Sequence, residues 1–273
     1  MKLSIYTAAH RNDIFFKWCA DSIIHQNYDD WEWIILDNSP KRDLNLMLHD
    51  CYGKIDERIK VYNEVTGKKE IGFLKATAME LCTGKYLIEL DSDNILHEGA
   101  LLKVFETILK NPQADFIYSD YIEAWFDAEG IFKGHSLADP DTGIDKMKWN
   151  GQDGVVVKGN QFLTVNALSK GIFPMGLRIY RKDFSSLVGG VDKTIPVMED
   201  FDHILKIVAY NGHIIRLSNV CVINIHHTEN SQMKRSTQYY NDAIHQTFEK
   251  YASLLERRKE ERNLVELRYI PLL

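Results

Sequence analysis

Two aspartates, Asp91 and Asp93, directly follow a short apolar run, Tyr86–Leu90, whose composition predicts a buried strand. Carboxylates at positions i and i+2 after a strand can share one hard divalent cation with the oxygens of a phosphate ligand. The ordinary alternative is a helix N-cap beside a solvated loop acid, because aspartate is common at both kinds of position. The buried strand before the pair, and polar residues at other strand ends, favour the cation site.

Three acids, Glu199, Asp200 and Asp202, open a predicted helix over Glu199–Tyr210. Acids are favourable at a helix N-terminus, so the helix dipole alone is one explanation for all three, and for Asp202 we prefer it. A carboxylate at a helix start beside a ligand site can instead take a proton from a substrate hydroxyl. A neighbouring acid and partial burial would raise its pKa and make it a better base.

Histidines and single charged residues add further candidates. His226 and His227 close a predicted strand, where an imidazole is either structural or a ligand for a divalent ion. Asp37 ends the second predicted strand, a usual position for holding a nucleoside, although it could simply start the turn before Pro40. Lys75 could neutralise a phosphate or lie on a helix face.

Alternating strands and helices must position these residues. The expected strands are Lys2–Ala8, Trp31–Leu36, Ile59–Tyr62 and Tyr86–Leu90, and the helices between them are Ile14–Gln26, Leu44–Ile55 and Lys75–Cys82, the last ended by Gly84 as a C′ glycine. This order predicts a mostly parallel sheet with helices on both faces, which binds ligands at the carboxyl ends of its strands. Thr7–Arg11, Asp37–Ser39 and Asp91–Asp93 should therefore converge on one edge.

The second half of the chain is less regular. We expect a helix at Leu101–Leu109, one or two strands in Asp115–Trp125, a long polar loop from 126 to 159, strands at Gly176–Arg181, Ile214–Leu217 and Val220–Ile225, a short helix at Phe184–Val188, and a long helical tail over Ser236–Leu267. A loop of that length is usually functional or mobile. The tail carries an apolar stripe that could pack on the domain, form a dimer seam or lie on a membrane. Its mixed charges favour packing or dimerisation.

Composition excludes several classes of protein. The net charge of −6 is spread along the 273 residues, which disfavours stable nucleic-acid binding. No apolar run resembles a signal peptide or a membrane span, and the four cysteines lack metal-site spacing, so we expect reduced thiols and a cytoplasmic protein. Glycine-rich phosphate loops and a GxSxG elbow are absent from the sequence, which disfavours kinases, ATPases, classical dehydrogenases and serine hydrolases.

With these residues in hand, about the first 232 residues resemble a family 2 glycosyltransferase with the GT-A fold. The resemblance rests on six segments in order, LSIYTAAHR, SIIHQNYDDWEWIILDNS, IGFLKATAMELCTGKYLIELDSDN, RIYRKDFSSLVGGVD, MEDFDHILKIVAYNG and HHTENS. It implies an α/β, Rossmann-like sandwich with a mostly parallel central sheet, followed by the helical tail. The GT-A domain would cover residues 1–235, with a nucleotide-sugar half of about 1–110 and an acceptor half of about 111–235, and the tail would cover 236–273.

The resemblance also implies an inverting transfer of a sugar from a nucleotide-diphosphate donor to an acceptor hydroxyl. The donor would be a UDP-, GDP- or dTDP-sugar, the acceptor a glycan or glycoconjugate, and the cofactor Mn²⁺ or Mg²⁺. The implied metal ligands are Asp93, Asp91 and His227 or His226; the implied nucleotide-binding residues are Thr7, Ala9, Arg11, Asp37, Lys75, Asp91 and Ser92; Asp200 would be the base with Glu199 beside it; and Gly189, Gly190 and Asp192 would lie near the acceptor.

Two rival functions stay open at this point. A nucleotidyltransferase acting on a sugar phosphate uses a similar sheet and paired acids, but it normally carries a glycine- and lysine/arginine-rich loop that this sequence lacks after its first strand. A non-catalytic nucleotide-sugar-binding module would have lost its base, whereas both acidic pairs, Asp91 with Asp93 and Glu199 with Asp200, are present. The tail leaves a homodimer as a further expectation.

Overall fold

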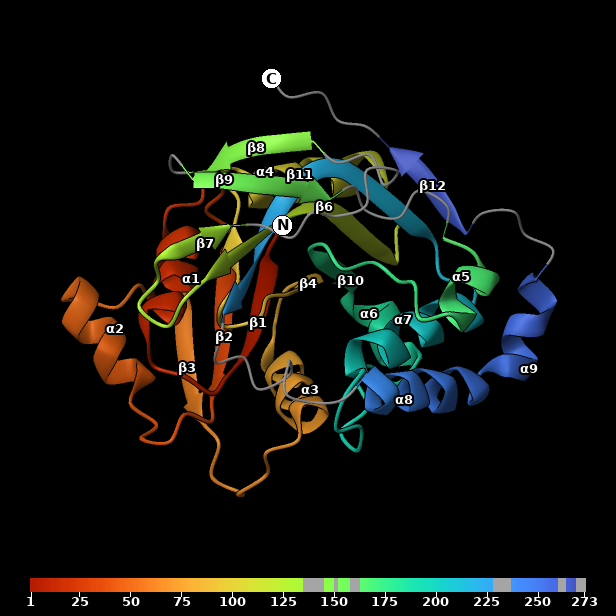
Figure 1. Cartoon of the computed structure of the whole chain (residues 1–273), viewed down its shortest axis with the longest axis horizontal. Coiled ribbons are helices and arrows are strands. Elements are labelled where there is room, and N and C mark those ends of the chain that lie inside the picture. The colour runs from red at the N-terminus through yellow and green to blue at the C-terminus, as the bar shows by residue number, and fades with distance from the viewer. Residues whose placement is uncertain (135–144, 150–151, 158–162, 228–236, 260–263, 269–273) are drawn as a thin grey trace.

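A computed structural model gives the fold of the chain (Figure 1). It describes residues 1–134, 145–149, 152–157, 163–227, 237–259 and 264–268. Within these residues, no helix has the length and apolar character needed to cross a membrane.

Strands and helices alternate through the first half of the chain, as expected from the sequence. The strands are β1 (Leu3–Ala9), β2 (Trp31–Asp37), β3 (Ile59–Asn63), β4 (Tyr86–Glu89), β5 (Ile95–Leu96), β6 (Phe116–Phe126), β7 (Phe132–Gly134), β8 (Asp145–Trp149), β9 (Gln152–Val157), β10 (Arg178–Arg181), β11 (Ile214–His227) and β12 (Val265–Arg268). The helices are α1 (Ile14–Ile24), α2 (Leu44–Tyr52), α3 (Ile71–Leu81), α4 (Ala100–Lys110), α5 (Val165–Ser169), α6 (Lys182–Leu187), α7 (Glu199–Ala209), α8 (Thr237–Glu249) and α9 (Ala252–Leu255), the last continued by a 3₁₀ turn at Glu256–Arg258.

One central sheet organises the molecule, in the order β12-β11-β6-β10-β4-β1-β2-β3. Neighbours along this order are parallel except β10, which is antiparallel to both β4 and β6. The register aligns Ala9 with Asp37 and Asp37 with Asn63, so the carboxyl ends of β1, β2 and β3 meet at one edge. The prediction of a mostly parallel, Rossmann-like α/β sheet is confirmed.

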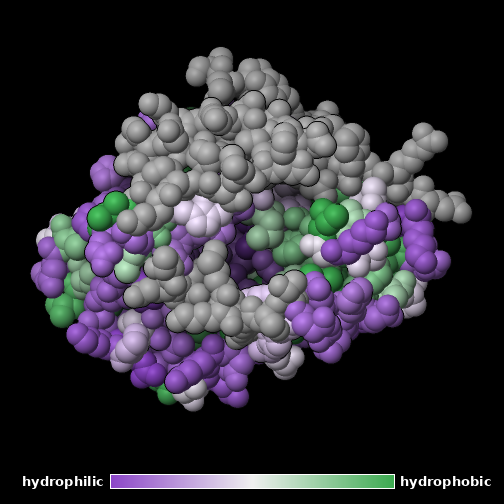
Figure 2. Space-filling view, viewed as in Figure 1, coloured by the Kyte–Doolittle hydropathy of each residue, from purple (hydrophilic) through white to green (hydrophobic). Residues whose placement is uncertain are grey.

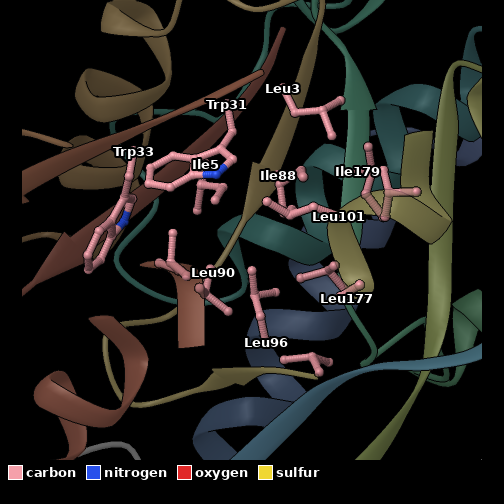
Figure 3. Packing of buried hydrophobic residues seen from close by; sticks show 14 of the residues in the cluster. Leu3, Ile5, Trp31, Trp33, Ile88, Leu90, Leu96, Leu101, Leu177 and Ile179 are labelled. Atoms are coloured by element: carbon pink, nitrogen blue, oxygen red, sulfur yellow. The ribbon is translucent and has the colours of Figure 1, made fainter. Parts of the chain in front are cut away.

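Helices cover both faces of the sheet, and each face has its own apolar core. Side chains of α1, α2 and α4 pack on one face in the larger core, where Trp31, Trp33 and Ile88 lie (Figure 3). Side chains of α3, α5, α7 and α9 pack on the other face. Burying each large apolar side chain contributes about 1.5–3 kcal/mol, which holds the strand ends in fixed positions.

Helix α3 corrects two expectations. It begins at Ile71, one turn before the expected start at Lys75. Its C-cap, Cys82, is extended, with φ −66° and ψ 140°, so Gly84 is not a left-handed C′ residue. Gly84 is needed for a different reason, because a Cβ there would lie 2.6 Å from Ser4 Oγ and 2.7 Å from Lys2 O.

The polar segment from 126 to 159 is not a plain loop where the structure describes it. It contains β7, β8 and β9, and β9 pairs antiparallel with β6 while β8 pairs with β9. Residues 135–144, 150–151 and 158–159 of the predicted loop lie outside the described residues. Three consecutive β-branched residues, Val155, Val156 and Val157, were the strand signal that the polar composition obscured.

Strand β11 replaces two short predicted strands. Residues 214–227 form one strand along β6, with register irregularities between Leu217 and Val220 and between Val220 and Val222. Polar Ser218 and Asn219 interrupt the apolar pattern without ending the strand, because a β-bulge absorbs the extra residues.

The tail is not one helix. It forms α8, α9 and a 3₁₀ turn, and it ends in β12, which pairs parallel with β11. Ile244, Phe248, Tyr251 and Leu254 of the tail pack against the core beside α7. The apolar stripe of the tail therefore packs on its own domain, which was one of the two preferred predictions.

Candidate active site

A cavity of about 830 Å³ opens at the carboxyl edge of the sheet. Figure 2 shows a hollow near the centre of the molecule, hydrophilic in its depth and bordered on one side by apolar residues. The cavity walls come from the ends of β1, β2 and β4, from α3, and from the segments around α7 and α8; its lining residues include Ala8, His10, Asn38, Ser39, Arg42, Lys75, Asp91, Ser92, Asp93, Phe173, Met175, Met198, Glu199, Asp200 and Tyr240.

Strand β4 delivers the aspartate pair to this cavity. Asp91, Ser92 and Asp93 all line it, as the sequence predicted. Thr7 stabilises the end of the strand, because its Oγ1 donates to Leu90 O at 2.8 Å. The two carboxylates differ in their partners: Asp93 Oδ2 lies 3.1 Å from His227 Nε2, while Asp91 Oδ1 lies 3.1 Å from Lys75 Nζ.

The two histidines at the end of β11 have different environments. His227 is 2% exposed, stacks on Phe15 with ring centroids 4.7 Å apart, and has Arg11 Nη1 at 3.2 Å from each ring nitrogen. His226 stacks on Trp125 at 4.4 Å instead. Neighbouring residues of a strand face opposite sides of the sheet. His227 contacts Asp93 directly, whereas His226 borders a smaller cavity that Asp93 also lines. The geometry favours His227 over His226 as the partner of Asp93.

The donor set suits a divalent cation that shares its shell with a ligand. In the described part of the chain, no group of three or more His, Cys, Asp or Glu side chains is arranged to hold a metal by itself. Mg²⁺ and Mn²⁺ do not require such a group, because protein sites often supply one or two carboxylates and leave the other positions to water and substrate phosphates. Asp93 with His227, and the partly exposed Asp91, fit that arrangement.

Helix α7 brings the second acidic pair to the opposite wall. Met198 adopts a left-handed conformation with φ 65°, after which Glu199 and Asp200 open the helix. Asp200 Oδ1 accepts the N–H of Phe201 at 2.7 Å, and its Oδ2 lies 3.3 Å from Arg178 Nη1. The Asp200 side chain is 15% exposed and borders both this cavity and a smaller one of about 200 Å³ beside it.

Glu199 is more enclosed than Asp200. Its Oε1 lies 2.9 Å from Lys75 Nζ, and the residue is 5% exposed. Burial raises the pKa of Glu199 above its ordinary value; Lys75 opposes this effect and Asp200 adds to it. Both acids line the cavity, and Asp200 is the more exposed of the two, at 15% against 7% for the side chain of Glu199.

Several predicted nucleotide-binding residues lie beneath the cavity rather than on its wall. Thr7 and Ala9 are buried in β1, whereas Ala8 and His10 line the cavity. Side chains alternate between the two faces of a strand. An assignment that is shifted by one residue therefore exchanges the residues on the cavity wall with those beneath it. Arg11 does not line the cavity either; its guanidinium contacts His227 and forms an ion pair with Asp13 at 2.5 Å.

Asp37 also has a structural environment. It is fully buried, with Oδ1 accepting the N–H of Ser39 at 2.8 Å and Oδ2 accepting that of Leu44 at 3.1 Å. It therefore shapes the turn before α2, and Asn38, Ser39 and Arg42 of that turn reach the cavity. The turn-starting interpretation describes Asp37 better than direct contact with a nucleoside.

The predicted acceptor residues do not line the cavity. Gly189 and Gly190 have φ of +92° and +57°, and Asp192 Oδ1 accepts from the N–H and the hydroxyl of Thr194. This turn packs on α3, where a Cβ on Gly72 would lie 2.4 Å from Asp192 O. The turn supports α3 and leads into Pro196–Met198, which line the cavity in its place.

The sequence did not identify three apolar wall residues, Phe173, Met175 and Tyr240. Phe173 and Met175 precede β10 in a segment with no recognisable motif, and Tyr240 belongs to α8. The apolar stripe of the tail included Tyr240, but nothing in the sequence related that stripe to strand ends more than a hundred residues earlier.

Comparison with known proteins agrees with this geometry. Residues 4–169 match the model of Glycosyl transferase family 2, and the chain belongs to that family. Among curated relatives, it is 22% identical to the chondroitin synthase of Escherichia coli over 85% of this chain and 30% of that protein. It is 28% identical to the O-antigen biosynthesis glycosyltransferase WbnJ of Escherichia coli over 40% of this chain and 42% of that protein. The chain thus spans less than half the length of either relative.

Solved structures share the fold. TarS residues 1–349 of S. aureus, in complex with UDP-GlcNAc, superpose with a TM-score of 0.62 at 13% identity, over 93% of this chain and 72% of that one. The same TarS fragment in complex with UDP gives a TM-score of 0.60 at 15% identity. The expected GT-A architecture is confirmed.

Proposed function

We propose that this protein is a metal-dependent, inverting glycosyltransferase that moves a sugar from a nucleotide-diphosphate donor to an acceptor hydroxyl in glycan or glycoconjugate synthesis. One observation carries the proposal: Asp93, whose carboxylate contacts His227, and Asp200 line the same cavity from different walls, so a metal-bound diphosphate and a general base can act on one sugar between them. Membership of the glycosyltransferase family supports the same reaction.

Asp200 acts as the base in this proposal. Its carboxylate takes the proton of the acceptor hydroxyl as the oxygen attacks the anomeric carbon of the donor sugar. The bond from that carbon to the diphosphate breaks on the opposite side, and the diphosphate leaves with the bonding electrons. Attack opposite the leaving group inverts the configuration at that carbon.

Asp93, His227 and Asp91 would hold the cation, Mn²⁺ or Mg²⁺. When bound, it neutralises the charge that develops on the departing diphosphate. The turn containing Asn38, Ser39 and Arg42 lies along the same cavity and is the proposed contact for the nucleoside, in place of Asp37. His10 and Ala8 complete that wall.

A uridine nucleotide is the first donor to test. The structural neighbour TarS was solved with UDP-GlcNAc and with UDP, and it shares the fold over most of this chain. GDP- and dTDP-sugars are the alternatives.

We place the reaction in the cytoplasm, which is supported by the free thiols of Cys19, Cys51, Cys82 and Cys221. A homodimer through α8 stays a prediction, which the oligomeric state in solution would test.

The first experiment is thermal unfolding with UDP, GDP, dTDP and their sugars, each with Mn²⁺, with Mg²⁺ and with chelator. A ligand that binds the folded state raises the unfolding midpoint. We expect one nucleotide to raise it only with metal, and its sugar to be transferred to added acceptors. Binding of a nucleotide sugar that is neither transferred to an acceptor nor hydrolysed would favour a binding module. Release of pyrophosphate from a nucleoside triphosphate would favour a nucleotidyltransferase.

A further inference from the structure

Glu89, the last residue of β4, has a buried ring of partners. Glu89 is 4% exposed, and its carboxylate lies 2.7 Å from Lys75 Nζ and 3.0 Å from Arg178 Nη2. The hydroxyls of Tyr180 and Tyr6 donate to Glu89 Oε2 at 3.0 Å and 3.3 Å. Two cations and two phenols thus converge on a single carboxylate at the end of the central strand.

The fold requires these partners. Ile88 faces the larger core, so Glu89 faces the other side of the sheet, where Arg178 is its direct neighbour across the β4–β10 pair. An isolated buried carboxylate would be very unfavourable. Burial by itself raises the pKa of Glu89, but Arg178 and Lys75 outweigh it and hold that pKa well below its usual range.

Each cation also extends from Glu89 to an acid on the cavity wall. Arg178 Nη1 lies 3.3 Å from Asp200 Oδ2. Lys75 Nζ lies 3.1 Å from Asp91 Oδ1 and 2.9 Å from Glu199 Oε1. Glu89 is therefore connected through one side chain to the proposed base and through another to the first acid of the aspartate pair.

We propose that Arg178 is a positioning residue for Asp200, and that Glu89 fixes the guanidinium so that it orients this carboxylate toward the acceptor hydroxyl. The inference rests on the proposed transferase function. Arg178 Nη2 and Nε bind Glu89, which leaves Nη1 for Asp200 Oδ2, while the N–H of Phe201 binds Asp200 Oδ1. Both oxygens of Asp200 are thereby oriented from the sheet and from its own helix.

Lys75 has a matching role on the donor side. The sequence suggested that it neutralises a phosphate, but its ammonium already contacts three carboxylates at 3.1 Å or less. It therefore holds Asp91 relative to Glu89. The same buried carboxylate then fixes the separation between the donor acids and the base, which come from strands and helices far apart in the sequence.

The test compares Arg178→Ala with Arg216→Ala. Arg216 of β11 is a matched control, because it forms another buried ion pair, at 2.6 Å to Asp120, and does not line the cavity. We expect Arg178→Ala to lower kcat about 10- to 100-fold, the scale of a misplaced catalytic group, with little change in donor KM. We expect Arg216→Ala to lower the unfolding midpoint and leave kcat close to that of the wild type.

Chemical rescue separates positioning from a general structural effect. Arg178 lines the smaller cavity together with Asp200, so added guanidinium at millimolar concentration can reach the vacated position. We expect it to restore part of the kcat of Arg178→Ala and to have no effect on Arg216→Ala. Unchanged kcat in Arg178→Ala would overturn the inference, and so would a loss that guanidinium does not restore in a folded variant.

Glu89→Gln provides a second measurement if Arg178→Ala fails to fold. It retains the volume of the side chain but loses the charge that fixes Arg178, so kcat should fall more than donor KM rises. A folded Glu89→Gln with wild-type kcat would also overturn the inference. The activity of the wild type distinguishes failure of the proposed function from failure of this inference. Absence of any sugar transfer by the wild type refutes the proposed function. Normal transfer by the wild type and an unchanged kcat in the variants refutes only the role of Arg178.

Discussion

The proposed donor and acceptor sides of the cavity are built in different ways. On the donor side, the neighbouring parallel strands β4, β1 and β2 end at one edge, and each contributes residues at or directly after its carboxyl end. On the acceptor side, the wall comes from the segment before β10, the start of α7 and the tail helix α8. The donor side is thus a property of local sequence order, whereas the acceptor side depends on contacts between distant segments.

This difference teaches which substitutions should affect which substrate. Changes on the donor side should alter nucleotide and metal binding, and changes on the acceptor side should alter turnover or acceptor binding. Glu89 joins the two sides, because Lys75 connects it to Asp91 and Arg178 connects it to Asp200. The predictions below test this separation, beginning with the largest expected effect.

Asp200→Asn should lower kcat by about 10²- to 10⁴-fold, because it removes the proposed base and keeps the shape of the side chain. Metal-dependent nucleotide binding, measured by the unfolding midpoint, should persist. Asp183→Asn is the control, since that carboxylate is 76% exposed in the first turn of α6. Wild-type turnover in Asp200→Asn would remove this residue from the mechanism.

Asp93→Asn and His227→Ala should each weaken Mn²⁺-dependent UDP binding about 10- to 100-fold, in the range found for residues that support a metal site. The measurement is a titration of Mn²⁺ at fixed UDP. His226→Ala is the comparison variant, because its ring stacks on Trp125 while the ring of His227 contacts Asp93. If His226→Ala had the larger effect, the assignment of the two histidines would be reversed.

His203, a fully buried residue of α7, should make the free energy of unfolding depend on pH. Burial lowers its pKa to about 3, so below pH ~6.5 the unfolded chain binds a proton that the folded protein does not. Stability contributed by the neutral ring is therefore complete above pH ~6.5 and decreases at up to ~1.4 kcal/mol per pH unit as the pH falls toward 3.

The measurement for His203 is denaturant unfolding of the wild type and of His203→Gln from about pH 7.5 to about pH 5. This range includes the ordinary histidine pKa of about 6.5, at which the unfolded chain takes up the proton. The variant should be less stable at neutral pH and should lose less stability on acidification. His245→Gln, at an exposed position of α8, should behave as the wild type does. Parallel curves for His203→Gln and the wild type would contradict the prediction.

Tyr240→Ala should raise acceptor KM by roughly 5- to 10-fold, corresponding to about 1 kcal/mol for an aromatic contact, and leave donor KM unchanged. The adjacent Tyr239→Ala serves as the control, because Tyr239 does not line the cavity. Steady-state kinetics with each substrate varied in turn separates the two constants. An increase in donor KM alone would show that the tail belongs to the donor side.

Sequence reasoning succeeded where local order determines position. Apolar strands followed by Asp91 and Asp93 could be recognised, and so could the acids that open α7, because strand ends and helix starts are local features. It was less successful at one-residue resolution: Thr7 and Ala9 were assigned to a wall that Ala8 and His10 line. The orientation of a strand depends on which face the surrounding helices cover, and that is a tertiary property.

The remaining differences have the same origin. Asp37 could be a ligand contact or a turn residue, and only the backbone N–H groups of Ser39 and Leu44 decide between them. Arg178 carries no local signal for its role, because its importance comes from lying opposite Glu89 across an antiparallel pair. Tyr240 reaches the cavity only because the tail folds back onto α7.

The pairing of β12 with β11 has a consequence for solubility. Strand β11 is long, and its side away from β6 would present unpaired backbone groups that another chain could join by strand addition. β12 covers Ile214–Leu217 of that side, and β5 covers Val222 and Ile223. Shortening the chain after Lys259 would remove β12 and expose that edge, so such a variant should self-associate at concentrations where the full chain does not.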